Sequence, residues 1–326
     1  MPRKKTAPRV SAVQAPEDDE RRFFDALYAE WIPLHDRRPA TLYHYTNAQG
    51  LLGIVQSHRL WAGDARFLND PSEIEYAANA IRESIVWVTK HYASPLPNTF
   101  TRQVVADLDG FVAEARVYIC CFCHKGDLLS QWRGYGAQGG GYSIGFDTTD
   151  FGDREVSFPL PKPILRRVIY KPPVQQRLIR TWLQAACDLS AGTGLARHRH
   201  SGARIGWMNH LIFTFRMLLP EFLLCFKNPE YEEEQEWRLI QFGRVKGKPI
   251  IKPEFRASGG RILPYAILDM THSKDRYKGK LPIQAIRFGP TLDPDSTTRS
   301  LQLLSRAAGY KPESLTIASS AIPFSG

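Results

Sequence analysis

The 326-residue chain contains little cysteine and has no long uninterrupted hydrophobic run. Its five cysteines are too few for a disulfide framework, so we expect a reducing, cytoplasmic setting. The longest apolar stretch, Leu211 to Phe226, is broken by Arg216, Pro220 and Glu221 and is shorter than the roughly 20 apolar residues that cross a bilayer. We therefore expect no membrane partner.

Acidic residues are outnumbered, because 33 Asp+Glu stand against 43 Lys+Arg and leave a formal net charge of +10. A basic balance favours an anionic partner such as a nucleic acid or a nucleotide, although a solvated basic surface explains it equally well. Met1 to Pro16 carries basic residues, no acid and no hydrophobic periodicity. The sequence therefore predicts a disordered basic tail over residues 1–17 and a single domain over residues 18–326.

The hydrophobic pattern of the predicted domain indicates helices and strands that are segregated rather than regularly alternating. Thr41–Thr46, Gly141–Asp147 and Trp237–Phe242 have the composition of strands, and a helical insertion is expected near residues 175–226. This organisation favours the α+β class over a doubly wound sheet. The sequence leaves the oligomeric state open.

Two patterns resemble known binding motifs, but their contexts are wrong for those motifs. Gly134–Gly139 matches G-x-G-x-x-G, yet it follows a helix-like segment and precedes a strand, whereas a dinucleotide fingerprint follows a strand and opens a helix. Cys120 and Cys121 lie on a strand predicted over Arg116–Phe122, where adjacent side chains point to opposite faces, and Cys123 follows it. We therefore expect no metal site, and interpret these cysteines as small buried residues.

An acidic run at residues 230–236 ends where an apolar strand begins. On a strand, Glu234, Glu236 and Arg238 would share one face. Repulsion between the two carboxylates would raise the pKa of one of them, while Arg238 would keep the other ionised. A carboxylate at a strand end can stabilise a developing positive charge, and a plain Glu236–Arg238 ion pair is the alternative.

Several motifs taken together resemble a bacterial family catalogued as domain of unknown function 2971. They run from Thr41 to Phe324 and comprise the segments Leu42–Thr46, Phe67–Glu73, Ser130–Gly136, Gly141–Phe146, Glu234–Leu239 and Ser320–Phe324. That family is in turn similar in motif order to ADP-ribosyltransferases. The resemblance implies split antiparallel sheets with helices packed around them, and NAD as the substrate.

The same resemblance implies roles for particular residues. His44 matches the first-strand position and would bind the adenosine-side ribose of NAD, and Glu236 and Glu234 match a later E-x-E pair that would act in catalysis. In the motif order of ADP-ribosyltransferases, a Tyr or a Ser occupies a middle position between these two. The candidates for this middle position are Ser130, Tyr135 and Tyr142. The sequence has no clear Ser-Thr-Ser element, so the acceptor remains undetermined. The remaining candidates for NAD contacts are Tyr45, Thr46, Trp132 and Arg238.

The sequence thus favours an NAD-dependent ADP-ribosyltransferase that modifies a nucleic acid or a protein. A role as a toxin or a phage-defence effector is implied by the resemblance alone. Two alternatives are a non-catalytic nucleic-acid-binding module, favoured by the net charge, and a nucleic-acid hydrolase that uses His44 and the carboxylates.

Overall fold

A computed structural model describes residues 31–323 with gaps, the longest of which are residues 93–97, 152–162, 193–211 and 271–276. The predicted tail over residues 1–17 lies outside the described residues, as does a large part of the predicted helical insertion. No helix in the described part of the chain is long and apolar enough to span a bilayer.

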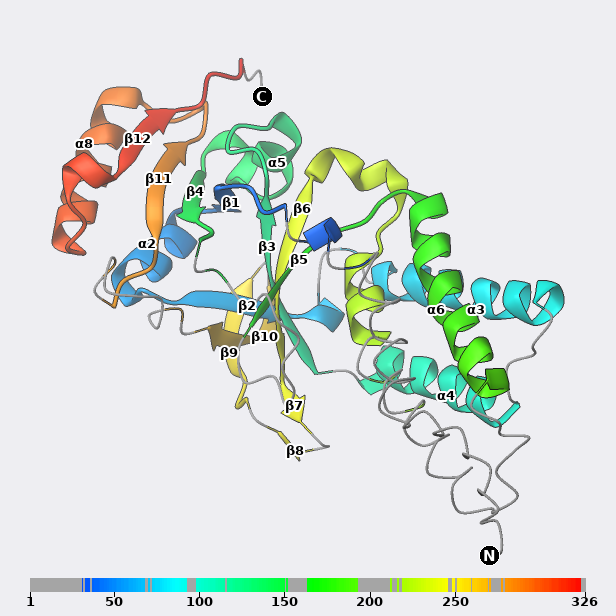
Figure 1. Ribbon diagram of the computed structural model, residues 1–326. Helices are drawn as coiled ribbons and strands as arrows, with labels where there is room; N and C mark the ends of the chain where they lie inside the picture. Colours follow the sequence, from blue (N-terminus) through cyan, green and yellow to red (C-terminus); the bar gives the residue numbers. More distant parts are fainter. Residues whose placement is uncertain are drawn as a thin grey trace, which may run out of the picture.

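A ten-stranded sheet runs through the centre of the molecule (Figure 1). Its main path has the order β12-β11-β4-β1-β3-β2-β10-β9, and β6 pairs with β3 and with β5. Among the described pairs of this sheet, β11 and β12 are parallel and the others antiparallel. The strands are β1 (Thr41–Thr46), β2 (Leu60–Asp64), β3 (Val117–Cys123), β4 (Tyr142–Asp147), β5 (Ile164–Arg167), β6 (Glu236–Phe242), β9 (Glu254–Ser258), β10 (Arg261–Leu268), β11 (Ile283–Phe288) and β12 (Thr316–Ser319). A separate hairpin comprises β7 (Arg244–Val245) and β8 (Lys248–Pro249).

The sheet branches at β3, and this branch positions the site described below. One edge of β3 pairs with β6 along its whole length. The other edge pairs with β1 at Cys123 and with β2 at Ile119 and Tyr118. Within the described strands, the β3 residues between these two ladders have no strand partner on that side. The backbone there is left open to side chains or to a ligand, because a buried peptide group needs a hydrogen-bond partner.

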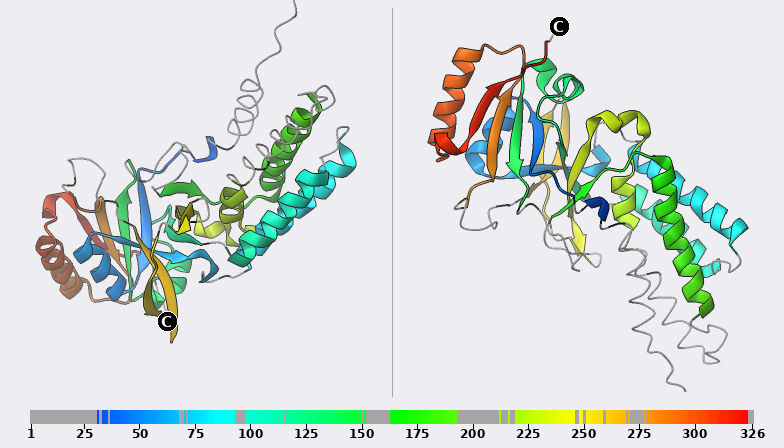
Figure 2. Two further views of the ribbon diagram at one scale, coloured as in Figure 1. Left: turned by 90° about the horizontal axis from the view of Figure 1, so that it is seen from below. Right: turned by 45° about the horizontal axis from the view of Figure 1, so that its top comes forward.

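Helices cover the sheet in two groups that build separate hydrophobic cores. The helices α3 (Glu73–His91), α4 (Asn98–Glu114) and α6 (Pro172–Gly192) form one core, which includes Ile119 of β3. The helices α2 (Ala48–Ser57) and α8 (Pro294–Ala307) belong to the other, which includes Tyr118 and Phe122. Alternate residues of β3 thus enter different cores, as the period of a strand requires. Figure 2 shows α3 and α6 side by side, projecting away from the sheet.

The predicted α+β class is confirmed, and the expected strands are present. The interpretation of the glycine-rich motif is also confirmed, since Gly134–Gly139 follows the short helix α5 (Leu129–Gly134) and precedes β4. The described helix α6 lies largely within the predicted insertion, whereas residues 193–211 lie outside the described residues.

Candidate functional site

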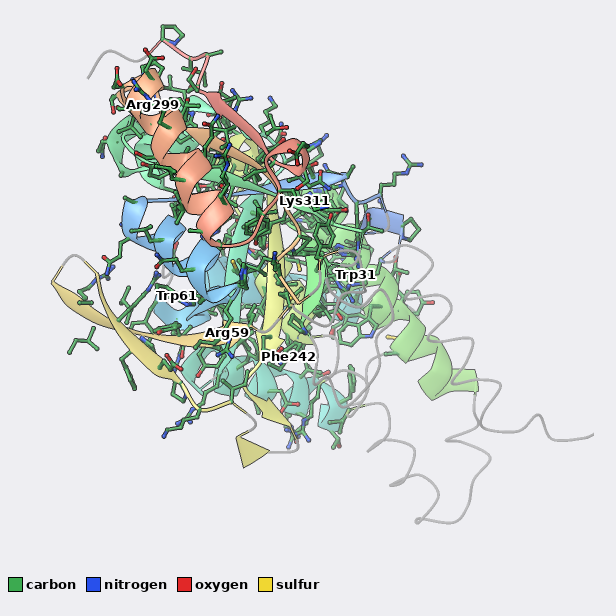
Figure 3. The ribbon with its side chains drawn as sticks, turned by 90° about the vertical axis from the view of Figure 1, so that its left-hand side faces the viewer. Trp31, Arg59, Trp61, Phe242, Arg299 and Lys311 are labelled. Carbon is green, nitrogen blue, oxygen red and sulfur yellow. The ribbon has the colours of Figure 1, made fainter. Side chains whose placement is uncertain are left out.

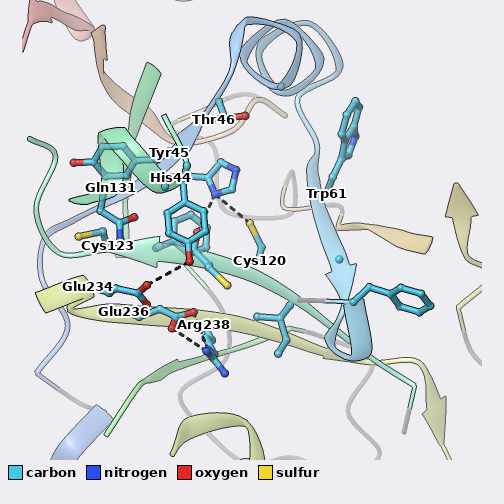
Figure 4. A pocket seen from close by; sticks show the side chains of 18 of the residues that line it. His44, Tyr45, Thr46, Trp61, Cys120, Cys123, Gln131, Glu234, Glu236 and Arg238 are labelled. Carbon is cyan, nitrogen blue, oxygen red and sulfur yellow. Dashed lines mark hydrogen bonds and ion pairs between the residues drawn. The ribbon is translucent and has the colours of Figure 1, made fainter. Parts of the chain in front are cut away.

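A cavity of about 460 Å³ opens where β1 and β2 part from β3. Its walls come from both branches of the sheet, from α3 and α5, and from the turn before β6 (Figure 4). Seven of the ten residues that the sequence proposed for the site line this cavity, namely His44, Tyr45, Thr46, Tyr135, Glu234, Glu236 and Arg238. The fold therefore assembles residues from β1, from the end of α5, from the turn before β6 and from β6, and the most distant of them, His44 and Arg238, are 194 positions apart in the chain.

His44 occupies the gap between the two ladders on β3. Its Nδ1 lies 2.8 Å from the carbonyl oxygen of Cys121, and because a carbonyl can only accept, Nδ1 must carry the hydrogen. Burial lowers the pKa of His44, although the bond to Cys121 opposes this effect, and the charge of Arg256 lowers the pKa further. The imidazole is therefore neutral at pH 7, and its Nε2 is a hydrogen-bond acceptor.

Glu236 is the first residue of β6 and is 6% exposed. Its Oε1 accepts from Arg238 Nε at 2.8 Å, and its Oε2 accepts from Arg238 Nη2 at 2.8 Å and from Lys227 Nζ at 3.2 Å. Burial by itself would raise the pKa of this carboxyl, but Arg238 and Lys227 outweigh that effect and lower the pKa to about 2. Glu236 is therefore ionised at pH 7, and the Glu236–Arg238 ion pair that the sequence suggested as an alternative is present.

The backbone of Glu234 differs from the sequence expectation, but its carboxylate faces the same charged groups as that of Glu236. It ends a 3₁₀ turn, Pro229–Glu234, and Gln235 follows with left-handed φ 45° and ψ 47°, so the expected strand alternation does not reach it. Its carboxylate accepts from Lys227 Nζ at 2.6 Å and from the Tyr135 hydroxyl at 3.3 Å. Burial raises the pKa of Glu234, and the nearby Glu236 adds to the rise against the opposing charge of Lys227.

Lys227 and Glu73 also form ion pairs with Glu234, Glu236 and Arg238, and the sequence expectations included neither residue. Lys227 Nζ lies 2.8 Å from Glu73 Oε1, and Arg238 Nη2 lies 2.5 Å from Glu73 Oε2. Glu73 begins α3, so its carboxylate appeared to serve only the start of a helix. Lys227 could have been predicted, because it lies between the apolar run and the acidic residues. No neighbouring residue in the sequence indicates that Glu73 contacts this site.

The other end of the cavity is aromatic and basic. Trp61 of β2 lies across the cavity from Glu234 and Glu236 in Figure 4. Arg256 of β9 and Arg261 of β10 also line the cavity, and neither has an ion pair among the described residues. Gly63 of β2 faces open space, since a Cβ built there would meet no atom within 4 Å. None of these residues stands out in the sequence.

The cysteines that the sequence assigned to the interior also line the cavity. Burial raises the pKa of Cys120 to about 12, and it raises the pKa of Cys121, with a further contribution from the negative charge of Glu236. Both thiols are therefore protonated at neutral pH, and a protonated thiol is a poor nucleophile. The Cys121 thiol, in turn, acts to lower the pKa of Glu236.

Three of the proposed residues do not line the cavity. The hydroxyl of Ser130 donates to Glu233 at 3.0 Å on the surface. Trp132 is fully buried and its indole donates to Asp127 at 2.8 Å. Tyr142 packs against the core of α2 and α8. Of the three candidates for the middle position, the structure thus places Tyr135 at the cavity.

Tyr45 lines the cavity, but its hydroxyl is hydrogen-bonded to the backbone of the loop before α5. It donates to the carbonyl of Lys125 at 2.9 Å and accepts from the amide of Leu128 at 3.1 Å. Its ring packs edge-on against Trp132, with centroids 4.9 Å apart. These contacts hold the loop before α5, so Tyr45 shapes the wall beside Tyr135.

Comparison with known proteins covers a part of the chain that lines this cavity. Residues 131–239 match the family described as protein of unknown function, DUF2971. The expected family is confirmed over this segment, which contains Tyr135, Glu234, Glu236 and Arg238 and begins after the strand that carries His44. No curated protein and no solved structure matches the chain.

Proposed function

We propose that this protein is an ADP-ribosyltransferase that uses NAD as its substrate and transfers ADP-ribose to a nucleic acid or a protein. The observation that carries the proposal is the cavity at the branch of the sheet, which brings the neutral His44, the ionised Glu236 and Tyr135 together. His44 comes from β1, Tyr135 directly follows α5, and Glu236 begins β6.

The chemistry of the lining residues suits cleavage of a glycosidic bond to a positively charged ring. When the nicotinamide–ribose bond breaks, its electron pair leaves with nicotinamide and positive charge develops on the ribose. A carboxylate that stays ionised stabilises this charge, and Glu236 meets that requirement because Arg238 and Lys227 lower its pKa. The bonds to Arg238 and Lys227 also fix its orientation before the reaction.

The other residues supply recognition and proton transfer. The free Nε2 of His44 can accept a hydrogen bond from a ribose hydroxyl. An acceptor that attacks the ribose carbon must lose a proton, and a carboxylate with a raised pKa is a suitable base. Glu234 has that property, and Tyr135 bonds it from the cavity wall. The products are nicotinamide, a proton and the ADP-ribosylated acceptor.

The test is to incubate the full-length protein with NAD labelled in its adenylate phosphate, together with fractions of a cell lysate. We expect release of nicotinamide and transfer of label. Glu236→Gln should lower the rate about 100-fold or more. Tyr135→Phe, at a 39% exposed position, keeps the ring and removes the hydroxyl, and should lower the rate with little effect on folding.

Tyr142→Phe is the matched control, because Tyr142 lies outside the cavity, and we expect its rate to equal that of the wild type. Two results would overturn the proposal. One is the absence of nicotinamide release with every acceptor fraction, together with no change in melting temperature on adding NAD. The other is equal activity of the Tyr135→Phe and wild-type proteins.

A further inference from the structure

The two ends of the cavity differ in charge. At the β6 end, three carboxylates outnumber two cations, and these groups are Glu73, Glu234, Glu236, Lys227 and Arg238. At the opposite end, Arg256 and Arg261 face the cavity without an ion pair among the described residues. A ligand with charges of both signs would therefore experience an orienting field along the cavity.

Arg238, one of the residues that the sequence suggested for NAD contacts, is unable to bind the phosphates. Its Nε and Nη2 donate to Glu236, its Nη2 also donates to Glu73, and its Nη1 donates to the carbonyl of Leu224. The side chain is 3% exposed, so its guanidinium is fully engaged inside the protein. A phosphate-bearing ligand must find its cationic partner elsewhere on the cavity wall.

The β9–β10 hairpin provides that partner. Arg256 pairs in register with Leu263, and both lie on the hairpin face that lines the cavity, as does Arg261. Both arginines are exposed, so a ligand reaches them without opening a buried ion pair. Trp61 stands beside this face, with its ring 5.3 Å from that of Tyr265, and offers an aromatic surface for a base.

We infer that the β2–β9–β10 end of the cavity is a diphosphate subsite, where Arg256 and Arg261 hold the phosphates of a dinucleotide whose positively charged ring lies toward Glu234 and Glu236. Guanidinium groups bind phosphate oxygens with paired, charge-assisted hydrogen bonds. His44, between the two ends, contacts the nicotinamide-side ribose that joins them, rather than the adenosine-side ribose expected from the resemblance. This orientation rests on the proposed function, whereas the phosphate subsite itself requires only the charges on the hairpin.

The test measures binding of ADP-ribose and of nicotinamide to the full-length protein by calorimetry. Arg256→Gln should raise the dissociation constant of ADP-ribose about tenfold and leave that of nicotinamide unchanged. The affinity of the wild type for ADP-ribose should fall with added salt more steeply than that of the variant. Arg261→Gln should act in the same direction.

Arg299→Gln is the matched control, since it removes the same charge from α8, which Figure 3 shows well away from Trp61. The inference is overturned if the wild type does not bind ADP-ribose, or if Arg256→Gln and Arg261→Gln bind it as the wild type does. Nicotinamide release from NAD is measured separately. Arginine-dependent binding of ADP-ribose without nicotinamide release would support the subsite and contradict the transferase.

Discussion

Glu234 and Glu236 are two residues apart, and their surroundings move their pKa values in opposite directions. Burial acts to raise both values. Glu236 has both Arg238 and Lys227 as partners, and their charges more than compensate for burial. Glu234 has Lys227 as its cation, and burial prevails. Two carboxylates with separated pKa values are the arrangement in which one group stabilises charge and the other exchanges protons.

Replacement of Glu236 should destabilise the protein in a pH-dependent way. Glu236→Gln leaves Arg238 buried with one carboxylate fewer, so we expect the free energy of unfolding to fall by about 3–5 kcal/mol at pH 7. The lowered pKa of Glu236 contributes stability that is complete above its ordinary pKa of 4.5 and is lost as the pH falls toward about 2. The difference from the wild type should therefore shrink on acidification, as measured by urea unfolding between pH 7 and pH 3.

Glu234→Gln is the matched comparison, and its free energy of unfolding relative to the wild type should change with pH in the opposite direction. Because the pKa of Glu234 is raised, the stability linked to this group is present when it is protonated and is lost as the pH rises through the raised value. The glutamine of the variant does not titrate, so the variant does not lose this stability. Its free energy of unfolding relative to the wild type should therefore increase with pH. Identical pH profiles for the two variants would contradict this assignment.

At the scale of elements, β2 forms one wall of the cavity, and one of its residues that lines the cavity is a glycine, Gly63. Gly63 pairs with Ile119 on one side and with Tyr265 on the other, so it lies within the sheet rather than at an edge. A glycine inside a strand costs about 0.5–1 kcal/mol relative to alanine. An added side chain at Gly63 meets open space, so the strand tolerates one at the expense of cavity volume.

Gly63→Val should therefore separate ligand binding from folding. Valine favours strands, so we expect the free energy of unfolding to stay the same or to rise by up to about 1 kcal/mol. Its methyl groups enter the cavity, and binding of ADP-ribose and NAD should weaken at least about tenfold. Gly110→Ala, on the exposed face of α4 with equally open surroundings, is the control and should leave binding unchanged. Wild-type affinity in Gly63→Val would show that ligands do not use this cavity.

At the scale of the whole molecule, the cavity is a junction between the two hydrophobic cores. β1 and β2 contribute residues to the core of α2 and α8, whereas Glu73 begins α3 in the other core. The ion pairs of Glu73 with Lys227 and Arg238 link α3 to the segment before β6 and to β6 itself. A ligand in this cavity contacts walls that belong to both cores.

Binding of NAD should consequently stabilise the molecule against global unfolding. A ligand that binds the folded state alone adds about 2.7 kcal/mol at a concentration of 100 times its dissociation constant. We expect the melting temperature in scanning calorimetry to rise with NAD concentration in wild type and to change little in Gly63→Val. A second transition that NAD leaves unaffected would mean that the ligand couples to one core alone.

The sequence by itself determined the elements that line the cavity and the place of Glu236 at the start of a strand. Thr41–Thr46 alternates as a strand, the boundary between the acidic run and the apolar strand places Glu236 at a strand start, and the context of Gly134–Gly139 excludes a dinucleotide fingerprint. These features depend on neighbours within a few residues, which local patterns report. The family match over residues 131–239 covers the glycine-rich segment and the start of β6.

Tertiary structure alone decided which polar residues meet at the site. Glu73 joins Arg238 across 165 positions of the chain, and the hairpin of β9 and β10 brings Arg256 to the cavity through its pairing with β2. Tyr135 faces the site while Tyr142 does not, because α5 packs beside the turn before β6. Contacts of this kind depend on how the sheet branches at β3, and strand pairing over such separations leaves no periodicity in the sequence.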